Sequence, residues 1–212
     1  MLSCQNLTNQ NLTCQNLTIF SPECCPETDQ PLLKDISFSA MPGAMLYIVG
    51  PNGSGKTSLL KTLAGLRRNY QGSIILPESK NNAKVYNYIG HQNAIKKDLT
   101  VADNLNYWAS ATDGQNALLA VTRYLQLEPL LEKKCSTLSQ GMQKKLSLSR
   151  LMLSQAPLWL LDEVDTNLDA QNLAILNNLI KAKLSCAGIV LMSTHNSKLA
   201  PKCQKLNLED FY

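Results

Sequence analysis

The sequence predicts an α/β fold in which a mainly parallel sheet is covered by helices. Four apolar segments of strand length, residues 46–49, 85–89, 158–161 and 189–192, alternate with stretches of helix-forming residues. A glycine-rich segment directly follows the first of these strands. Because 212 residues suffice to bury a sizeable core, we expect one domain spanning residues 1–212.

The glycine-rich segment has the pattern of a phosphate-binding loop. Residues 50–57 read Gly-Pro-Asn-Gly-Ser-Gly-Lys-Thr, which fits G-x-x-x-x-G-K-[ST] between an apolar strand and the helix formers of residues 56–66. The backbone amides of such a loop and the following helix N-terminus form a concave anion site. Lys56 is expected to reach the terminal phosphates of ATP, and the Thr57 hydroxyl to bind Mg²⁺. The predicted nucleotide-binding residues are Gly50, Pro51, Asn52, Gly53, Ser54, Gly55, Lys56, Thr57 and Ser58. A P-loop NTPase is therefore expected.

A second apolar strand ends in two carboxylates. Residues 158–163 read Leu-Trp-Leu-Leu-Asp-Glu. Such a pair alone is usually a solvated strand end, but beside a phosphate-binding loop it predicts that Asp162 holds Mg²⁺ through water. Glu163 is then available to orient and deprotonate the attacking water, since ATP hydrolysis depends chiefly on positioning and charge stabilisation.

A short segment before a helix carries a resemblance to a known family. Residues 138–142 read Leu-Ser-Gln-Gly-Met, and the chain from about residue 32 to its end resembles the nucleotide-binding subunits of ABC transporters. The family signature is Leu-Ser-Gly-Gly-Gln, so Ser139 and Gly141 are kept while Gln140 and Met142 depart. The resemblance implies that Ser139 and Gly141 face the ATP bound to a second copy, in a homodimer with composite ATP sites.

Three further positions follow the order of elements in that family. The resemblance implies that Gln92 contacts Mg²⁺ or water and moves with the membrane partner. It also implies that residues 166–169 cross the dimer interface and that His195 contacts the γ-phosphate. The residue after the glutamate is usually proline in this family, whereas here it is Val164. Phe20 is the candidate to stack on adenine.

The remaining segments are assigned by pattern. Residues from about 97 to 153 lack strand-like segments and are expected to form a helical lobe that carries the signature. An apolar stripe of helical spacing after residue 170 is expected to face the core. Gln-Asn-Leu-Thr occurs three times within residues 5–18, which indicates a short duplication in which one copy forms the first strand.

Composition limits the partners. The 20 basic and 16 acidic residues, a net charge of +4, are scattered, so nucleic acid is not an expected partner. No apolar run approaches the roughly 18 residues that cross a bilayer, so transport would require a separate integral membrane permease. We therefore expect a peripheral protein on the cytoplasmic side of that permease, and the resemblance to transporter subunits implies that this is the cytoplasmic face of the bacterial inner membrane. Seven cysteines in such a compartment are expected to be free thiols.

Three stretches indicate which subfamily of ABC transporter subunits the chain resembles. Residues 88–96, 99–105 and 187–195 are similar to the haem exporter ATP-binding subunits of bacterial cytochrome c maturation. This resemblance implies an ATPase that energises haem export or haem-chaperone release alongside other cytochrome c maturation subunits. Two alternatives remain: the ATPase of another small exporter for lipid, peptide or drug, and a soluble module that acts on nucleic acid or the ribosome.

Overall fold

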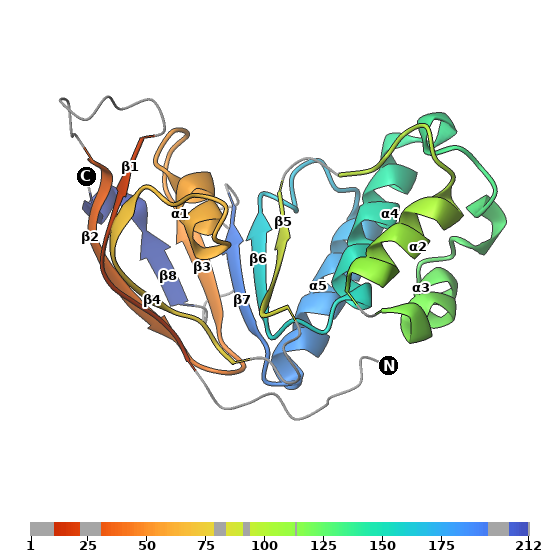
Figure 1. Ribbon diagram of the computed structural model, residues 1–212. Coiled ribbons are helices and arrows are strands. Elements are labelled where there is room, and N and C mark those ends of the chain that lie inside the picture. Colours follow the sequence, from red (N-terminus) through yellow and green to blue (C-terminus); the bar gives the residue numbers. More distant parts are fainter. Residues whose placement is uncertain are drawn as a thin grey trace.

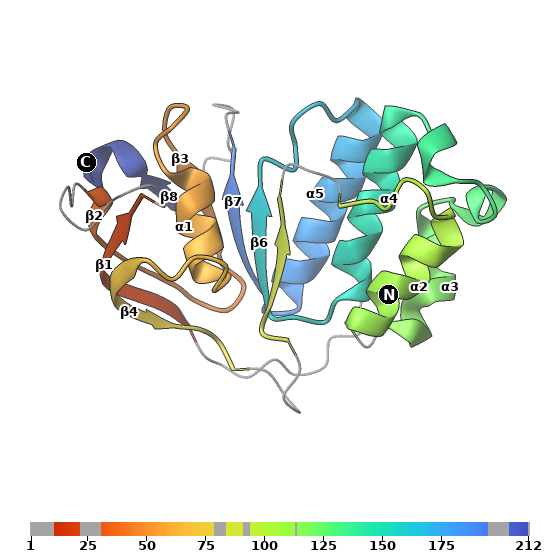
Figure 2. The ribbon, with the colours of Figure 1, turned by 45° about the horizontal axis from the view of Figure 1, so that its top comes forward.

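The computed structural model arranges an antiparallel sheet, a parallel sheet and the helices that cover them in layers. It describes residues 11–21, 31–78, 84–90, 94–112, 114–194 and 204–211. An antiparallel sheet, helix α1 (Lys56–Leu63), a parallel sheet, helix α5 (Ala170–Ser185) and a helical lobe follow one another across the molecule (Figure 1). The same order of layers is seen after a turn of the view (Figure 2).

The parallel sheet has the strand order β5-β6-β7-β3-β8. Its strands are β3 (Met45–Val49), β5 (Tyr86–Ile89), β6 (Leu158–Asp162), β7 (Ile189–Ser193) and β8 (Gln204–Asn207). Every pairing between these strands is parallel. Every residue of β6 and β7 is buried, as expected for central strands covered on both faces. The predicted α/β fold is confirmed, and the carboxyl ends of β3, β5, β6 and β7 meet at one edge.

The antiparallel sheet was not predicted as a unit. Its order is β2 (Pro31–Ala40), β1 (Leu12–Phe20) and β4 (Tyr70–Ile75). The third copy of the Gln-Asn-Leu-Thr repeat lies within β1. Bulges interrupt the register of β1 on both sides, and Asn16 at one bulge has a φ of 49°.

The helices lie in the segments of the chain for which the sequence predicts helix. They are α1 (Lys56–Leu63), α2 (Val101–Ala111), α3 (Leu118–Tyr124), α4 (Gln140–Leu153) and α5 (Ala170–Ser185). Single 3₁₀ turns lie at Gln115–Ala117, Glu128–Leu130, Cys135–Thr137 and Leu208–Phe211. Helices α2, α3 and α4 form one lobe around a core that includes Leu105, Val121 and Leu146.

Two more cores join the helices to the sheets. Leu59 and Leu60 of α1 pack between the two sheets. On the other face of the parallel sheet, Trp159 of β6 packs against Leu176 and Leu179 of α5. The apolar stripe of α5 therefore belongs to the core. The packing of α1 between the sheets also holds the loop before it at the edge where the parallel strands end.

None of the helices in the described part of the chain combines the length and hydrophobicity needed to cross a membrane.

Cys14 and Cys135 are free and buried, but Cys186 is disulfide-bonded, so the expectation of free thiols is wrong at Cys186. Composition cannot decide which thiols the fold brings within bonding distance.

Candidate functional site

The loop between β3 and α1 turns sharply at glycines. Gly53 and Gly55 have φ values of 83° and 87°, in the left-handed region that favours glycine. A Cβ on Gly55 would lie 2.8 Å from Leu33 Cδ1, so space as well as conformation requires glycine there. Gly55 is also the N-cap of α1 and offers no side-chain cap. The first amides of α1 are therefore left for an anion.

Lys56 is held inside this loop. Its side chain is 5% exposed, and Nζ donates hydrogen bonds to the Gly50 carbonyl at 2.8 Å and the Pro51 carbonyl at 2.9 Å. These two carbonyls hold the ammonium at the loop. A triphosphate entering the loop would meet a cation already in place.

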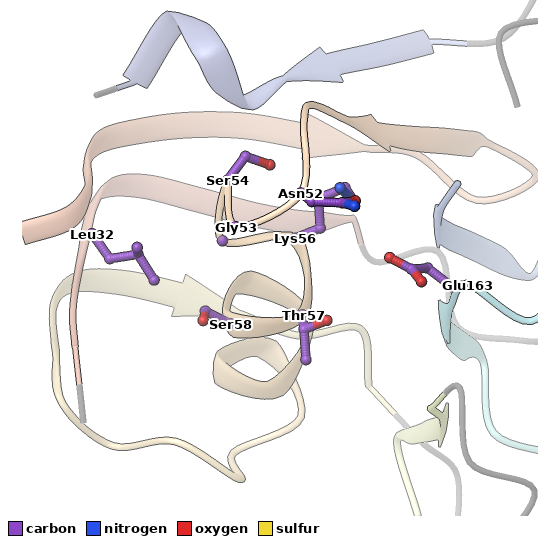
Figure 3. A pocket seen from close by; sticks show the side chains of 9 residues that line it. Leu32, Asn52, Gly53, Ser54, Lys56, Thr57, Ser58 and Glu163 are labelled. Carbon is purple, nitrogen blue, oxygen red and sulfur yellow. The ribbon is translucent and has the colours of Figure 1, made fainter. Parts of the chain in front are cut away.

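A pocket of about 420 Å³ opens over the loop. It is lined by Leu32, Asn52, Gly53, Ser54, Gly55, Lys56, Thr57, Ser58 and Glu163. Figure 3 shows Glu163 on the β6 side, across from the side chains that the loop and α1 contribute. A site of this volume suits a small ligand. Phe20 is not among the described residues that line it.

Asp162 receives hydrogen bonds from three hydroxyl groups. Thr57 Oγ1 donates to Asp162 Oδ1 at 3.1 Å, and Ser193 Oγ donates to the same oxygen at 2.7 Å. The Tyr88 hydroxyl donates to Oδ2 at 3.2 Å. Burial, and then the charge and hydrogen bond of Asp162, raise the pKa of Tyr88 well above its ordinary value, so Tyr88 remains a donor. The Thr57 hydroxyl and Asp162 carboxylate are hard oxygen ligands of the kind that Mg²⁺ prefers.

Sequence reasoning missed Tyr88 and Ser193. Strand register brings both residues to the site. Ser193 of β7 pairs with Asp162 of β6, and Tyr88 of β5 pairs with Leu160, two residues before Asp162. Adjacent parallel strands that end together bring their terminal side chains together. A polar side chain at the end of β7, Ser193, and one next to the end of β5, Tyr88, were the available clue.

Glu163 adopts an unusual backbone conformation immediately after β6. Its φ is 52°, which few residues other than glycine adopt. Its N–H donates to the Ser193 carbonyl at 3.2 Å and to Ser193 Oγ at 3.0 Å. The turn places Glu163 at the pocket while Asp162 stays buried behind it.

The signature segment begins α4, in the helical lobe. Ser139 is the N-cap, and its Oγ accepts a hydrogen bond from the Met142 N–H at 3.3 Å. Asn172 of α5 donates from Nδ2 to the Gly141 carbonyl at 3.3 Å. Ser139 and Gly141 do not line the pocket of their own chain. Their predicted contact with ATP therefore depends on a second copy.

Two predicted residues lie outside the described residues. These are Gln92, in the segment after β5, and His195, in the segment after β7. The strands before them end at the edge that holds the phosphate-binding loop. Thr194, the last described residue after β7, donates from Oγ1 to Asp165 Oδ2 at 2.6 Å. Their assigned roles stay predictions.

Known proteins resemble this chain over most of its length. A family model described as ABC transporter matches residues 33–166. The cytochrome c biogenesis ATP-binding export protein CcmA of Rickettsia conorii is 41% identical over 180 residues, covering 84% of this chain and 94% of that protein. The protein of the same name from Wolbachia pipientis wMel is 37% identical over 203 residues, covering 93% of this chain and 90% of that protein.

A solved structure agrees with these sequence matches. An ABC transporter ATP-binding protein from Pyrococcus furiosus superimposes with a TM-score of 0.76 at 25% sequence identity. The alignment covers 95% of this chain and 99% of the other. The arrangement of sheets and lobe is thus one that a solved ATP-binding protein shares.

Proposed function

The chain belongs to the ABC transporter family, and on that premise we propose that it is the ATP-hydrolysing subunit of an export complex in cytochrome c biogenesis. One observation carries the proposal: the phosphate-binding loop and Glu163 line the same pocket. Thr57, which also lines it, donates a hydrogen bond to the Asp162 carboxylate.

ATP would bind with its phosphates in the loop. The free amides at the start of α1 and the Lys56 ammonium neutralise the phosphate charge. Thr57 and Asp162 would hold Mg²⁺, directly or through water, and the bound ion would neutralise charge on the β- and γ-phosphate oxygens. The residues present fit this ion because both offer oxygen ligands, held 3.1 Å apart.

Hydrolysis follows from the place of Glu163 at the pocket. Its carboxylate orients a water molecule toward the γ-phosphorus and accepts the proton as the new oxygen–phosphorus bond forms. The bond from that phosphorus to the β–γ bridging oxygen breaks, and ADP and phosphate result. Catalysis of this kind depends on positioning and charge rather than on covalent chemistry.

The site is completed by a second copy of the chain. Ser139 and Gly141, at the N-terminus of α4, would face the γ-phosphate held by Lys56 of the partner copy. A helix N-terminus is suited to this because its first amides point outward. Gln140 and Met142, which depart from the family signature, are exposed in the single chain, and the composite site requires that their side chains point away from the phosphates.

The names of the relatives support a proposal for the membrane partner and the cargo. They are named cytochrome c biogenesis ATP-binding export proteins, so this chain would attach to an integral membrane permease on the cytoplasmic face of the inner membrane. Other cytochrome c maturation subunits would be nearby. The exported cargo would be haem, or the work of ATP would be release of a haem-loaded chaperone.

The test is purification of the Glu163→Gln protein from its own membranes with ATP present. This variant should bind ATP, fail to hydrolyse it and remain in the dimer, since removing a positioned base costs about 10²- to 10⁴-fold in rate. Glu132→Gln, at an exposed carboxylate of the helical lobe that does not line the pocket, is the matched control and should behave as the parent.

The proteins that co-purify decide between the candidate functions. Recovery of a haem-exporter permease with cytochrome c maturation components supports the proposal. An unrelated permease would keep the ATPase and replace the cargo with that of another small exporter. Recovery of ribosomes or nucleic acid without a membrane protein would overturn the transport role. Turnover of Glu163→Gln at the parent rate would overturn the assignment of the base.

A further inference from the structure

Asp162 is a buried carboxylate that hydroxyl groups hold in place. It is 1% exposed, and in the part of the chain that the structure describes no salt bridge reaches it. A buried charge without a cationic partner requires hydrogen bonds to each oxygen. Ser193 supplies the shortest one to Oδ1, and Tyr88 supplies the one to Oδ2. The two donors come from β7 and β5, on opposite sides of β6.

Ser193 contacts both acidic residues with one hydroxyl. Its Oγ donates its only proton to Asp162, and it accepts the N–H of Glu163 at 3.0 Å. The hydroxyl is therefore fully oriented, and its side chain is 0% exposed. Glu163, whose N–H it accepts, has a left-handed backbone, which is unfavourable for residues other than glycine. Ser193 thus stabilises the turn that sends Glu163 to the pocket.

Tyr88 is itself anchored to the helical lobe. Its carbonyl accepts a hydrogen bond from Arg150 Nη2 of α4 at 3.3 Å. The neighbouring Asn87 returns one from Nδ2 to the Arg150 carbonyl at 3.0 Å. These two hydrogen bonds attach β5 to α4, the helix that begins at the signature segment. The backbone of Tyr88 is therefore held in place while its hydroxyl donates to Asp162.

We propose that Tyr88 and Ser193 are positioning residues for ATP hydrolysis, which together hold the Asp162 carboxylate from both sides while Ser193 also sets the backbone of Glu163. The inference rests on the proposed function, because it assigns Asp162 to Mg²⁺ and Glu163 to the attacking water. Mg²⁺ demands near-ideal octahedral geometry, so a loosened carboxylate binds it less well. Groups that orient a metal ligand typically contribute about 10- to 100-fold to metal affinity or activity.

The test uses Ser193→Ala and Tyr88→Phe in the full chain, with two matched controls. Ser149→Ala removes an equally buried hydroxyl that donates only to Leu146 O, and Tyr86→Phe removes a phenol hydroxyl two residues earlier on β5. A fluorescent ATP analogue reports binding with and without Mg²⁺. Steady-state hydrolysis reports kcat and KM separately.

Both site variants should bind the analogue without Mg²⁺ as the parent does and require about tenfold more Mg²⁺ for the tighter complex. Ser193→Ala should also lower kcat by about 10- to 100-fold with KM for ATP nearly unchanged, since it releases Glu163 as well. Tyr88→Phe should lower kcat less. The controls should match the parent in every one of these measurements.

Three results would overturn the inference. The first is parent-like Mg²⁺ dependence and kcat in both site variants. The second is an equal loss in a site variant and its control. The third is weaker nucleotide binding without Mg²⁺, which would indicate general disruption of the fold. If the parent hydrolyses ATP and Glu163→Gln does not, the proposed function stands whatever these variants do. A parent that neither binds nor hydrolyses ATP would overturn both.

Discussion

Lys183 carries a buried charge whose effect on stability can be predicted from the structure. It lies on α5 and is 6% exposed, and its Nζ is 5.4 Å from the centroid of the Trp159 ring. Its aliphatic stem passes so close to Gly188 that a Cβ there would meet Cε at 2.5 Å. No hydrogen bond or ion pair joins the ammonium to the described residues. Burial lowers the pKa of Lys183 from its ordinary 10.5 to about 8.

The sign of the resulting pH dependence follows from proton binding. Between about pH 8 and 10.5 the unfolded chain keeps the Lys183 proton and the folded chain does not, so the free energy of unfolding rises with pH across this window. Below about pH 8 the full penalty of the buried charge is present. At about 1.4 kcal/mol per pKa unit, that penalty is about 3 kcal/mol. Lys183→Met removes the charge and places a thioether beside Trp159.

The assay is urea denaturation of the parent and Lys183→Met at pH 7 and pH 10, followed by circular dichroism. The advantage of Lys183→Met over the parent should shrink by about 2 to 3 kcal/mol from pH 7 to pH 10. All other ionisable groups titrate alike in both proteins, so their contributions to the free energy of unfolding cancel in the difference. Lys181→Met, at an exposed position of the same helix, should show no such change. A difference between parent and Lys183→Met that is equal at both pH values would refute the reasoning.

Four further changes test the loop, the signature and the scaffold. Lys56→Ala should weaken binding of a fluorescent ATP analogue by about tenfold or more, because it removes charge-assisted hydrogen bonds; unchanged affinity would contradict the phosphate role. Ser139→Ala should keep ATP binding but lose ATP-dependent dimerisation in gel filtration, and dimers that persist would exclude the composite site. Gly72→Ala should destabilise the protein by more than about 1 kcal/mol in urea denaturation, since φ is 99° and a Cβ would lie 2.4 Å from the Asn16 carbonyl; full stability would show that β1 yields there. Thr100→Ala should lower the free energy of unfolding by about 0.5 to 2 kcal/mol by removing the capping box of α2, whereas Thr100→Ser should not.

Contiguous patterns predicted the local elements well. The four predicted strands appear within one residue of their expected ends. Uninterrupted apolar runs mark β6 and β7 as central parallel strands, whereas the run of the edge strand β5 contains Asn87. The helix after the loop ends at Leu63 rather than residue 66, since Gly65 adopts a φ of 63° and its N–H turns back to the Thr62 carbonyl. Glycine at that position was a readable stop signal.

The antiparallel sheet was less predictable. Asn16 and Asp35 have positive φ and lie at irregularities in the pairing of β1 and β2, so strict alternation of buried and exposed residues is lost. Strand β4 is mostly exposed and shows little apolar signal. Strand β4 forms by pairing with β1, and β1 in turn packs against α1, which no short window of sequence reveals.

The sequence by itself determined the phosphate-binding loop, because all of its groups lie within eight consecutive residues and the backbone geometry is local. It also named the acidic pair at the end of β6. Only the tertiary structure decided which side chains meet that pair. Thr57 reaches Asp162 across 105 residues of chain, Tyr88 across 74 and Ser193 across 31. The register of β5, β6 and β7 brings the Tyr88 and Ser193 hydroxyls to this carboxylate, and the Thr57 hydroxyl comes from the first turn of α1. Register is set by packing across the whole sheet rather than by any one segment.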